Sequence, residues 1–200
     1  MKIFAEKEAE DFLRKENFNV VDSVFVREKS EIKKSLEKFR FPVVMKVSGK
    51  KILHKNFLGG VKTGIQNYEQ ALEMFDSLMK IKDSEGVIIQ NQIYGKEFLF
   101  GVKKTPEFNH VIAFGIGGTN VEKIKKITFR ICPLEDDDIL DMIREITKDI
   151  EGMDLDVIKK NIRALCHLSK KYPHINEFDI NPLMLDKGKA VIVDARIIFD

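Results

Sequence analysis

The sequence predicts an α+β fold in which short strands pair mainly as antiparallel hairpins. Short apolar runs rich in β-branched residues recur along the chain, and residues that favour turns separate them. Helical stretches with an apolar stripe stand between groups of these runs, not after every one of them. There is no internal repeat and no regular strand–helix–strand alternation, which favours hairpins over a regular α/β arrangement.

The first half of the chain is expected to contain three helices. Phe12 and Leu13 are apolar anchors of the first, and Ser30 is expected to cap the second. Asn67 and Gln70 have the spacing of a capping box before the third. In chain order we expect helix 4–16, strand 20–26, helix 30–39, strand 41–47, a turn at 59–60, strand 61–65, and a helix after Asn67 with the apolar stripe Ala71, Leu72, Phe75, Leu78 and Met79.

The second half is expected to contain most of the strands and two amphipathic helices. The four residues Asp186-Lys187-Gly188-Lys189 are a hairpin signal between two closing strands. Apolar residues at helical spacing, from Ile158 to Leu168, line the second helix. In chain order we expect strands 86–90, 97–102, 111–114 and 127–131, helices 135–148 and 155–171, and strands 180–185 and 190–193.

The composition is that of an ordinary soluble protein, and it excludes some function classes. Hydrophobic residues make up 44% and charged residues 33%, and the net charge is +2. This balance indicates neither a nucleic-acid partner nor a membrane, and no apolar run approaches the length of a membrane span. The two cysteines, Cys132 and Cys166, lack CxxC spacing, so we expect buried free thiols and a cytoplasmic location.

A histidine in an unusual setting is the first candidate for chemistry. His54 stands between apolar residues and Lys55, after the expected strand that carries Lys46. A neutral imidazole is a good phosphoryl acceptor near pH 7. Lys46 and Lys55 would neutralise a phosphoryl group on its ring, and amides after Gly59 and Gly60 would contact phosphate oxygens. A lone histidine between apolar residues is otherwise more often structural.

A second candidate lies near the C-terminus. Asp179 and Asn181 are two residues apart, so on a strand both face the same side. Asp194 ends the partner strand of the expected hairpin and can approach them, and Arg196 follows at the spacing that puts it on the face of Asp194. Two carboxylates and an amide oxygen suit Mg²⁺, and an arginine can clamp a phosphate. The alternative is that Asp179 and Asp194 are only charges that flank turns.

A third segment could hold a nucleoside. Gln90, Gln92 and Ile93 lie between two strands, where backbone groups would read adenine, and Glu97 could hold ribose hydroxyls. Gly115-Ile116-Gly117-Gly118 lacks the G-x-G-x-x-G fingerprint, and the chain has no Walker A sequence. If the chain binds ATP, it does so with another architecture.

These segments together resemble the β subunit of ADP-forming acyl-CoA synthetases, which are ATP-grasp proteins related to the β subunit of succinyl-CoA synthetase. The resemblance runs through nearly the whole chain. It is carried by Phe41-Pro42-Val43-Val44-Met45-Lys46, Ile52-Leu53-His54-Lys55 with Gly59-Gly60-Val61, Val111-Ile112-Ala113-Phe114-Gly115-Ile116-Gly117-Gly118, Phe129-Arg130-Ile131-Cys132-Pro133-Leu134, Asp179-Ile180-Asn181-Pro182-Leu183 and Val193-Asp194-Ala195-Arg196-Ile197.

The resemblance implies an ATP-grasp fold over 1–200, with two α+β lobes, about 17–90 and 91–200, and the nucleotide in the cleft between them. It implies the reaction of acyl-CoA, ADP and phosphate to give acid, CoA and ATP. In the family, a phosphate passes from a histidine of the α subunit to one on the β subunit and then to ADP. His54 matches the second histidine, and Lys46 the lysine on nucleotide phosphates.

The remaining roles also follow from the resemblance. Glu97 matches the acid that binds ribose, and Asn181 and Asp194 match Mg²⁺ ligands, with Asp179 beside them. The cofactors are Mg²⁺ and ADP/ATP, and CoA is expected on an α partner in an α₂β₂ assembly. Two other functions stay open from the residues: an ATP-grasp carboxylate–amine ligase, which needs no phosphorylated histidine, and a regulatory nucleotide-binding module. The sequence does not identify the acid or decide between ADP and GDP.

Overall fold

The computed structural model describes residues 2–52, 55–118, 126–148, 150 and 153–200. The chain divides into two compact units. The larger unit contains Met1–Phe4, Glu8–Val20 and Tyr94–Asp200, and the smaller one contains Ala5–Lys7 and Val21–Ile93. Both units combine helices with antiparallel sheets, so the expected α+β fold is confirmed.

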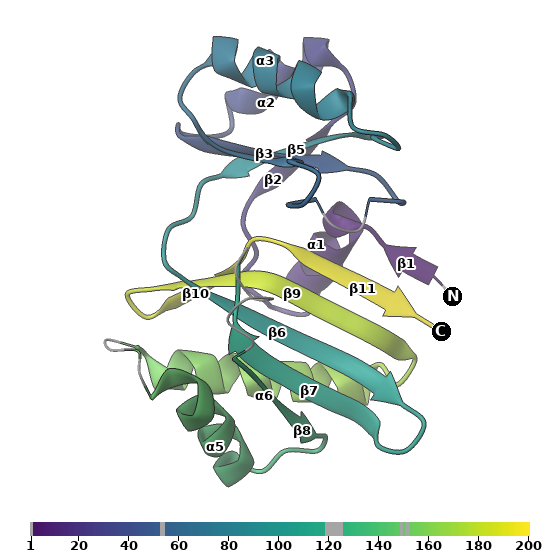
Figure 1. Ribbon diagram of the computed structural model, residues 1–200, viewed down its shortest axis with the longest axis vertical. Helices are drawn as coiled ribbons and strands as arrows, with labels where there is room; N and C mark the ends of the chain where they lie inside the picture. Colours follow the sequence, from purple (N-terminus) through teal and green to yellow (C-terminus); the bar gives the residue numbers. More distant parts are fainter. Residues whose placement is uncertain (1, 53–54, 119–125, 149, 151–152) are drawn as a thin grey trace. The chain divides into compact units, whose positions relative to one another are not determined.

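The larger unit is built on a seven-stranded sheet in the described part of the chain (Figure 1). The strands run in the order β1-β11-β9-β6-β7-β8, and β10 pairs with β9 outside this path. Their bounds are β1 Lys2–Phe4, β6 Lys96–Thr105, β7 Asn109–Ile116, β8 Ile127–Ile131, β9 Ile175–Asp186, β10 Lys189–Ile192 and β11 Ala195–Phe199. The helices are α5 Asp136–Thr147, α6 Leu155–Lys171 and α1 Glu6–Lys15, of which the residues from Glu8 onward belong to this unit.

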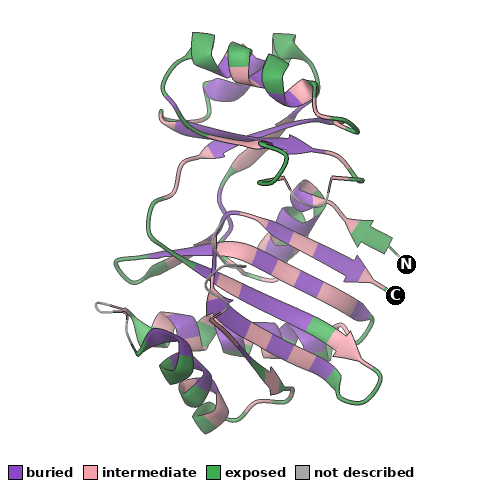
Figure 2. Ribbon diagram, in the orientation of Figure 1, coloured by how far each residue is buried: buried purple, intermediate pink, exposed green. Residues whose placement is uncertain are grey.

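One face of this sheet carries the core of the larger unit. The β9 residues Phe178 and Ile180 are buried there, whereas Asp179 and Asn181, which alternate with them, are half-buried and face the other side. Figure 2 shows buried and half-buried residues alternating along the strands of this sheet. α5 and α6 pack against the sheet through apolar residues at helical spacing. These residues are Ile139, Met142, Ile143 and Ile146 of α5 and Ile158, Ile162, Leu165 and Leu168 of α6.

The smaller unit has a four-stranded sheet in the described residues, in the order β2-β5-β3-β4. Its strands are β2 Ser23–Val26, β3 Val43–Ser48, β4 Val61–Ile65 and β5 Gly86–Asn91. Its helices are the 3₁₀ turn η1 Lys29–Glu31, α2 Ile32–Leu36 and α3 Tyr68–Met79. All six residues of β3 are buried, because β3 is a central strand with partners on both sides. The strand is therefore a rigid support for Lys46.

Most of the predicted elements are confirmed, and some parts of the prediction are wrong. Asp194 does not end the expected partner strand, because β10 ends at Ile192 and β11 begins at Ala195. Asn67 caps α3 by accepting from the Gln70 amide, and the β9–β10 hairpin forms where expected. The first helix begins at Glu6 instead of residue 4, because Lys2–Phe4 pairs with β11 as a strand. Ser30 is not the expected cap; Glu31 accepts the amides of Arg27 and Glu28 instead. The described helices include none that is long and apolar enough to cross a membrane.

Candidate functional site

Three polar residues of β9 and β11 form one row on the face of the large sheet that does not carry α5 and α6, and Asp194 lies just before β11. Arg196 on β11 lies directly opposite Asp179 on β9. One step along the same ladder, the Asn181 amide donates to the Asp194 carbonyl at 3.2 Å. Side chains alternate between faces along a strand, so Asp179, Asn181 and Arg196 project from one face. The same-face prediction is confirmed for Asp179 and Asn181, because both lie inside β9.

One hydrogen bond and one buried donor without a partner describe the surroundings of this row. The Asn181 Oδ1 atom accepts a hydrogen bond from the Gly118 amide at 2.9 Å. That bond fixes the orientation of the amide group, and a carbonyl oxygen still has a second lone pair. The Arg196 Nε atom is buried and has no hydrogen-bond partner within the described residues. A buried donor without a partner is costly, so a bound anion near Arg196 would satisfy it.

The glycine loop after β7 packs against the start of β6. The Gly117 amide donates to the Glu97 carbonyl at 2.8 Å. Gly118 has φ of 87°, and a β-carbon on it would lie 1.6 Å from the Glu97 Oε2 atom. Only glycine fits this position without displacing the carboxylate. The loop therefore places its amide on Asn181 and leaves Glu97 beside it, which the sequence pattern did not reveal.

We expect Gly118→Ala to lower the free energy of unfolding by about 1–2 kcal/mol, because an alanine at positive φ is strained. The contact with Glu97 should add to this loss. Gly64→Ala is a matched control: Gly64 has φ of 73°, but a β-carbon there meets nothing within 4 Å. Urea denaturation of both variants measures the difference. Equal losses would contradict a role of the Glu97 contact, and Glu97→Ala in the Gly118→Ala background should remove the excess.

A buried carboxylate joins two lysines in the smaller unit. The Lys46 Nζ atom lies 2.8 Å from Glu6 Oε1, and Lys55 pairs with Glu6 Oε2. The side chains of Lys46 and Glu6 are 5% and 4% exposed, and that of Lys55 is 14% exposed. Charged groups at such depth are stable only when paired. The prediction that Lys46 is not a solvated surface lysine is confirmed.

Burial and charge act in opposite directions on Glu6. Burial raises the pKa of the Glu6 carboxyl. The ammonium groups of Lys46 and Lys55 and their hydrogen bonds lower it by more than burial raises it, so the pKa lies below the ordinary value. Glu6 is therefore an anion at neutral pH. The Glu6 carboxylate presents negatively charged oxygens to two ammonium groups, as a phosphate bound between the same lysines would.

The lowered pKa of Glu6 predicts a loss of stability in acid. A carboxyl with a depressed pKa contributes its full stabilisation above its unfolded pKa of about 4.3 and loses it as pH falls through the folded pKa. We expect the free energy of unfolding to fall more steeply between pH 5 and 3 in the wild type than in Glu6→Gln. Urea titrations at several pH values measure both slopes. Identical slopes would show that Glu6 carries no such linkage.

The other predicted residues are placed as follows. His54 lies outside the described residues. The Gly59 and Gly60 amides donate to the carbonyls of Asn56 and Lys55, at 3.1 and 2.7 Å, so both shape the loop itself. Gln90 is buried at the end of β5, and Gln92 accepts the Gly64 amide at 2.6 Å. Ile93 is the last residue of the smaller unit, whereas Glu97 is exposed in the larger one.

Two residues of the candidate site escaped the sequence reasoning. Glu6 lies in the predicted first helix, where no local pattern indicates burial, although it is only 6% exposed. Its distance of 40 residues from Lys46 hides the pair from any local pattern. Gly118 was set aside because its loop lacks a dinucleotide fingerprint. The signal that could have found Gly118 is the glycine pair itself, since adjacent glycines often mark a close approach of backbone to a neighbour.

The chemistry of the donor set in the row fits Mg²⁺ better than a softer metal. Asp179, Asn181 and Asp194 supply only oxygen, and Mg²⁺ binds one or two carboxylates while keeping several waters. The described residues contain no cluster of three or more His, Cys, Asp or Glu that could hold a metal ion. Two carboxylates and one amide oxygen would leave several positions around a Mg²⁺ ion to water.

Comparison with known proteins gives the class to which this fold and these residues belong. A family model described as an ATP-grasp domain matches residues 1–199. The β subunit of an ADP-forming acetate–CoA ligase I from Pyrococcus furiosus is 33% identical over 96% of this chain and 90% of its own length. An ADP-forming acetate–CoA ligase II from Archaeoglobus fulgidus is 34% identical over 98% of this chain, but the chain spans only 30% of its length.

Solved structures agree. A dinucleotide-forming acetyl-CoA synthetase from Candidatus Korarchaeum cryptofilum, in complex with coenzyme A and Ca-AMPCP, matches with a TM-score of 0.90 and 26% identity, over 100% of this chain and 94% of that one. A Pyrococcus horikoshii protein matches with a TM-score of 0.89 and 30% identity, over 99% and 92% of the two chains. The chain therefore belongs to the ATP-grasp family of ADP-forming acetate–CoA ligase β subunits and domains.

Proposed function

We propose that the chain is the nucleotide-binding β subunit of an ADP-forming acyl-CoA synthetase that relays a phosphoryl group through His54 to ADP. The observation that carries the proposal is its match to two Pyrococcus furiosus β subunits over 90% of their lengths. A related Korarchaeum structure, 26% identical, is described with coenzyme A, Mg-AMPPCP and a phosphohistidine segment that points towards the nucleotide binding site. The reaction uses CoA and a nucleotide, so we place it in the cytoplasm.

The proposed relay divides the work between His54 and several charged side chains. The His54 imidazole would attack the γ-phosphorus of ATP. The bond from this phosphorus to the β,γ-bridging oxygen would break, and ADP would leave. The return step to ADP is the reverse. Lys46 and Lys55 would neutralise charge on the phosphoryl oxygens, and Arg196 would clamp a phosphate through its unpaired Nε atom. These groups supply charge and position, which is most of what phosphoryl transfer needs.

Asn181 and Asp194, with Asp179 beside them, are proposed to hold Mg²⁺. When bound, the ion would neutralise phosphate charge during transfer. The Gly118 amide donates to the Asn181 Oδ1 atom, and this bond would hold the side chain in place for the proposed role. Gln90, Gln92 and Ile93 are proposed to read the adenine, and Glu97 to bind the ribose. CoA and the acid are proposed to bind to an α subunit, in an α₂β₂ assembly.

The test is phosphoryl transfer from [γ-³²P]ATP with Mg²⁺, on the chain alone and with a family α subunit. We expect acid-labile, base-stable label on the wild type and none on His54→Ala. Label that survives His54→Ala would remove this histidine from the relay. No label under either condition would overturn the phosphotransfer. Turnover of a carboxylate and an amine by His54→Ala would favour a carboxylate–amine ligase, and nucleotide binding without any transfer would favour a regulatory module.

A further inference from the structure

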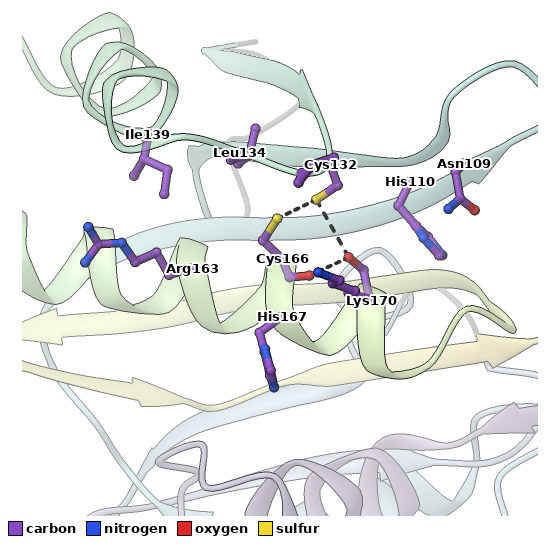
Figure 3. A pocket seen from close by; sticks show the side chains of 11 residues that line it. Asn109, His110, Cys132, Leu134, Ile139, Arg163, Cys166, His167 and Lys170 are labelled. Atoms are coloured by element: carbon purple, nitrogen blue, oxygen red, sulfur yellow. Dashed lines mark hydrogen bonds between the residues drawn. The ribbon is translucent and has the colours of Figure 1, made fainter.

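The two cysteines of the chain meet in a pocket of the larger unit. Cys132 follows directly after β8 and Cys166 lies within α6, and their sulfurs point toward one another 2.8 Å apart (Figure 3). Both residues are half-exposed, which corrects the expectation of buried thiols. The pocket has a volume of about 480 Å³, and the rest of its lining includes Leu134 and Ile139. A small reagent can therefore reach a pair of thiols that 34 residues of chain separate.

The two thiols differ in their acidity. The hydrogen bond from Cys132 lowers the pKa of Cys166 to about 7, against the opposing effect of burial, and Leu134 and Lys170 add to the lowering. The same contact and burial raise the pKa of Cys132 above the ordinary thiol value. At neutral pH one member of the pair is thus partly a thiolate and the other a thiol, which is the arrangement of an attacking and a resolving cysteine.

The charge around the pair favours an anionic reagent. The titratable side chains that line the pocket besides the cysteines are His110 of β7 and Arg163, His167 and Lys170 of α6. His110 is engaged with the Ile175 carbonyl, and Arg163 with Asp136 of α5. The described lining of the pocket contains no carboxylate. A thiolate beside cationic side chains is stabilised and attracts negatively charged partners.

We propose that Cys132 and Cys166 are a modification site, a dithiol that anionic low-molecular-weight disulfides oxidise to an intramolecular disulfide. The Cys166 thiolate attacks one sulfur of the reagent, a mixed disulfide forms, and one reagent thiolate leaves. Cys132 then gives up its proton and attacks the Cys166 sulfur, which expels the second reagent thiolate. Two electrons pass from the protein to the reagent, which becomes two thiols. This site is separate from the proposed phosphoryl relay and does not depend on it.

The bond would tie the end of β8 to α6. Closure requires the sulfurs to approach by roughly 0.8 Å, since a disulfide bond is about 2.05 Å long. A cross-link that closes a loop of this length restricts the unfolded chain, and we expect the melting temperature to rise by about 10 °C. In a reducing compartment the pair would be a dithiol that oxidises transiently.

The experiment treats the reduced full chain with oxidised glutathione at pH 7, followed by mass spectrometry and thiol titration. The chain has only two cysteines, so every product can be assigned. We expect the wild type to lose both thiols without retaining glutathione, and tryptic digestion to give one peptide pair that carries both residues. The melting temperature of the oxidised chain should be about 10 °C higher than that of the reduced chain.

Two serine variants complete the test. Cys132→Ser should stop at the mixed disulfide and retain one glutathione on Cys166. Cys166→Ser should react at least about tenfold more slowly, because an ordinary thiol is mostly protonated at pH 7. Glutathione retained by the wild type, disulfides between two chains, or equal rates for the two variants would each overturn the proposal. The melting temperatures of the reduced variants show whether both remain folded.

Discussion

Asp194→Asn is expected to abolish phosphoryl transfer, with a loss of about 10³-fold or more. The substitution keeps the size of the side chain and removes one negative charge from the proposed Mg²⁺ ligands. A metal ion that neutralises phosphate charge contributes several kcal/mol to the transition state, and each 1.36 kcal/mol is a factor of ten in rate. The backbone bond between Asn181 and Asp194 uses the carbonyl of Asp194, so the strand pairing should persist. The rate of label transfer from [γ-³²P]ATP measures the effect.

Asp186→Asn is the matched control for this prediction. Asp186 ends β9 at the hairpin turn and is exposed, so its carboxylate is on the same strand as Asp179 but outside the row. We expect this variant to keep wild-type transfer. Transfer by Asp194→Asn at more than a tenth of the wild-type rate would exclude Asp194 from metal binding. A thermal shift on adding Mg²⁺ and nucleotide should be present in the wild type and the control, and reduced in Asp194→Asn.

The sequence predicted those parts of the fold in which a local pattern determines the structure. Strand β8 and helix α6 were predicted with the observed bounds, because alternation and helical spacing reflect which residues are buried. β1 and β11 were not predicted as strands. β1 is three residues long and becomes a strand only by pairing with Ile197–Phe199 at the other end of the chain. Such a pairing is a property of the tertiary structure and leaves no periodic signal in three residues.

In the candidate site, too, the sequence predicted those residues whose placement follows from a local pattern. The row of Asp179, Asn181 and Arg196 follows from the period of two along a strand, so the sequence was sufficient to place these residues on one face. The relation of Glu6 to Lys46 could not be predicted, because a charge in the first turn of a helix is normally solvated. Only the packing of residue 6 against β3 and the loop after it turns this carboxylate into a buried partner. The meeting of Cys132 and Cys166 is of the same kind.

Lys46→Met is expected to destabilise the chain by about 3–5 kcal/mol, because it leaves Glu6 buried beside only one of its two lysines. Removing one partner of a buried ion pair leaves a charge that burial penalises. Glu6→Gln should also destabilise the chain. The double variant should lose less than the sum of the two, since the amide and the thioether leave no uncompensated charge on this pair. Urea denaturation of the four proteins gives the coupling energy.

Lys103→Met is the control for this cycle, because it makes the same replacement in an exposed ion pair. Lys103 pairs with Glu177, and their side chains are 57% and 34% exposed. An exposed pair contributes at most about 1 kcal/mol, so the stability of this variant should remain close to that of the wild type.

The double-mutant cycle decides whether Glu6 and Lys46 are coupled. If the losses of the two single variants are strictly additive in the double variant, the pair is not coupled, and other groups compensate the cost of burying these charges. A coupling of about 2 kcal/mol or more would mean that Lys46 is held by a carboxylate before any phosphate arrives. If Lys46 binds nucleotide phosphates as proposed, the nucleotide would compete with Glu6 for this lysine, and Glu6→Gln should bind the nucleotide more tightly.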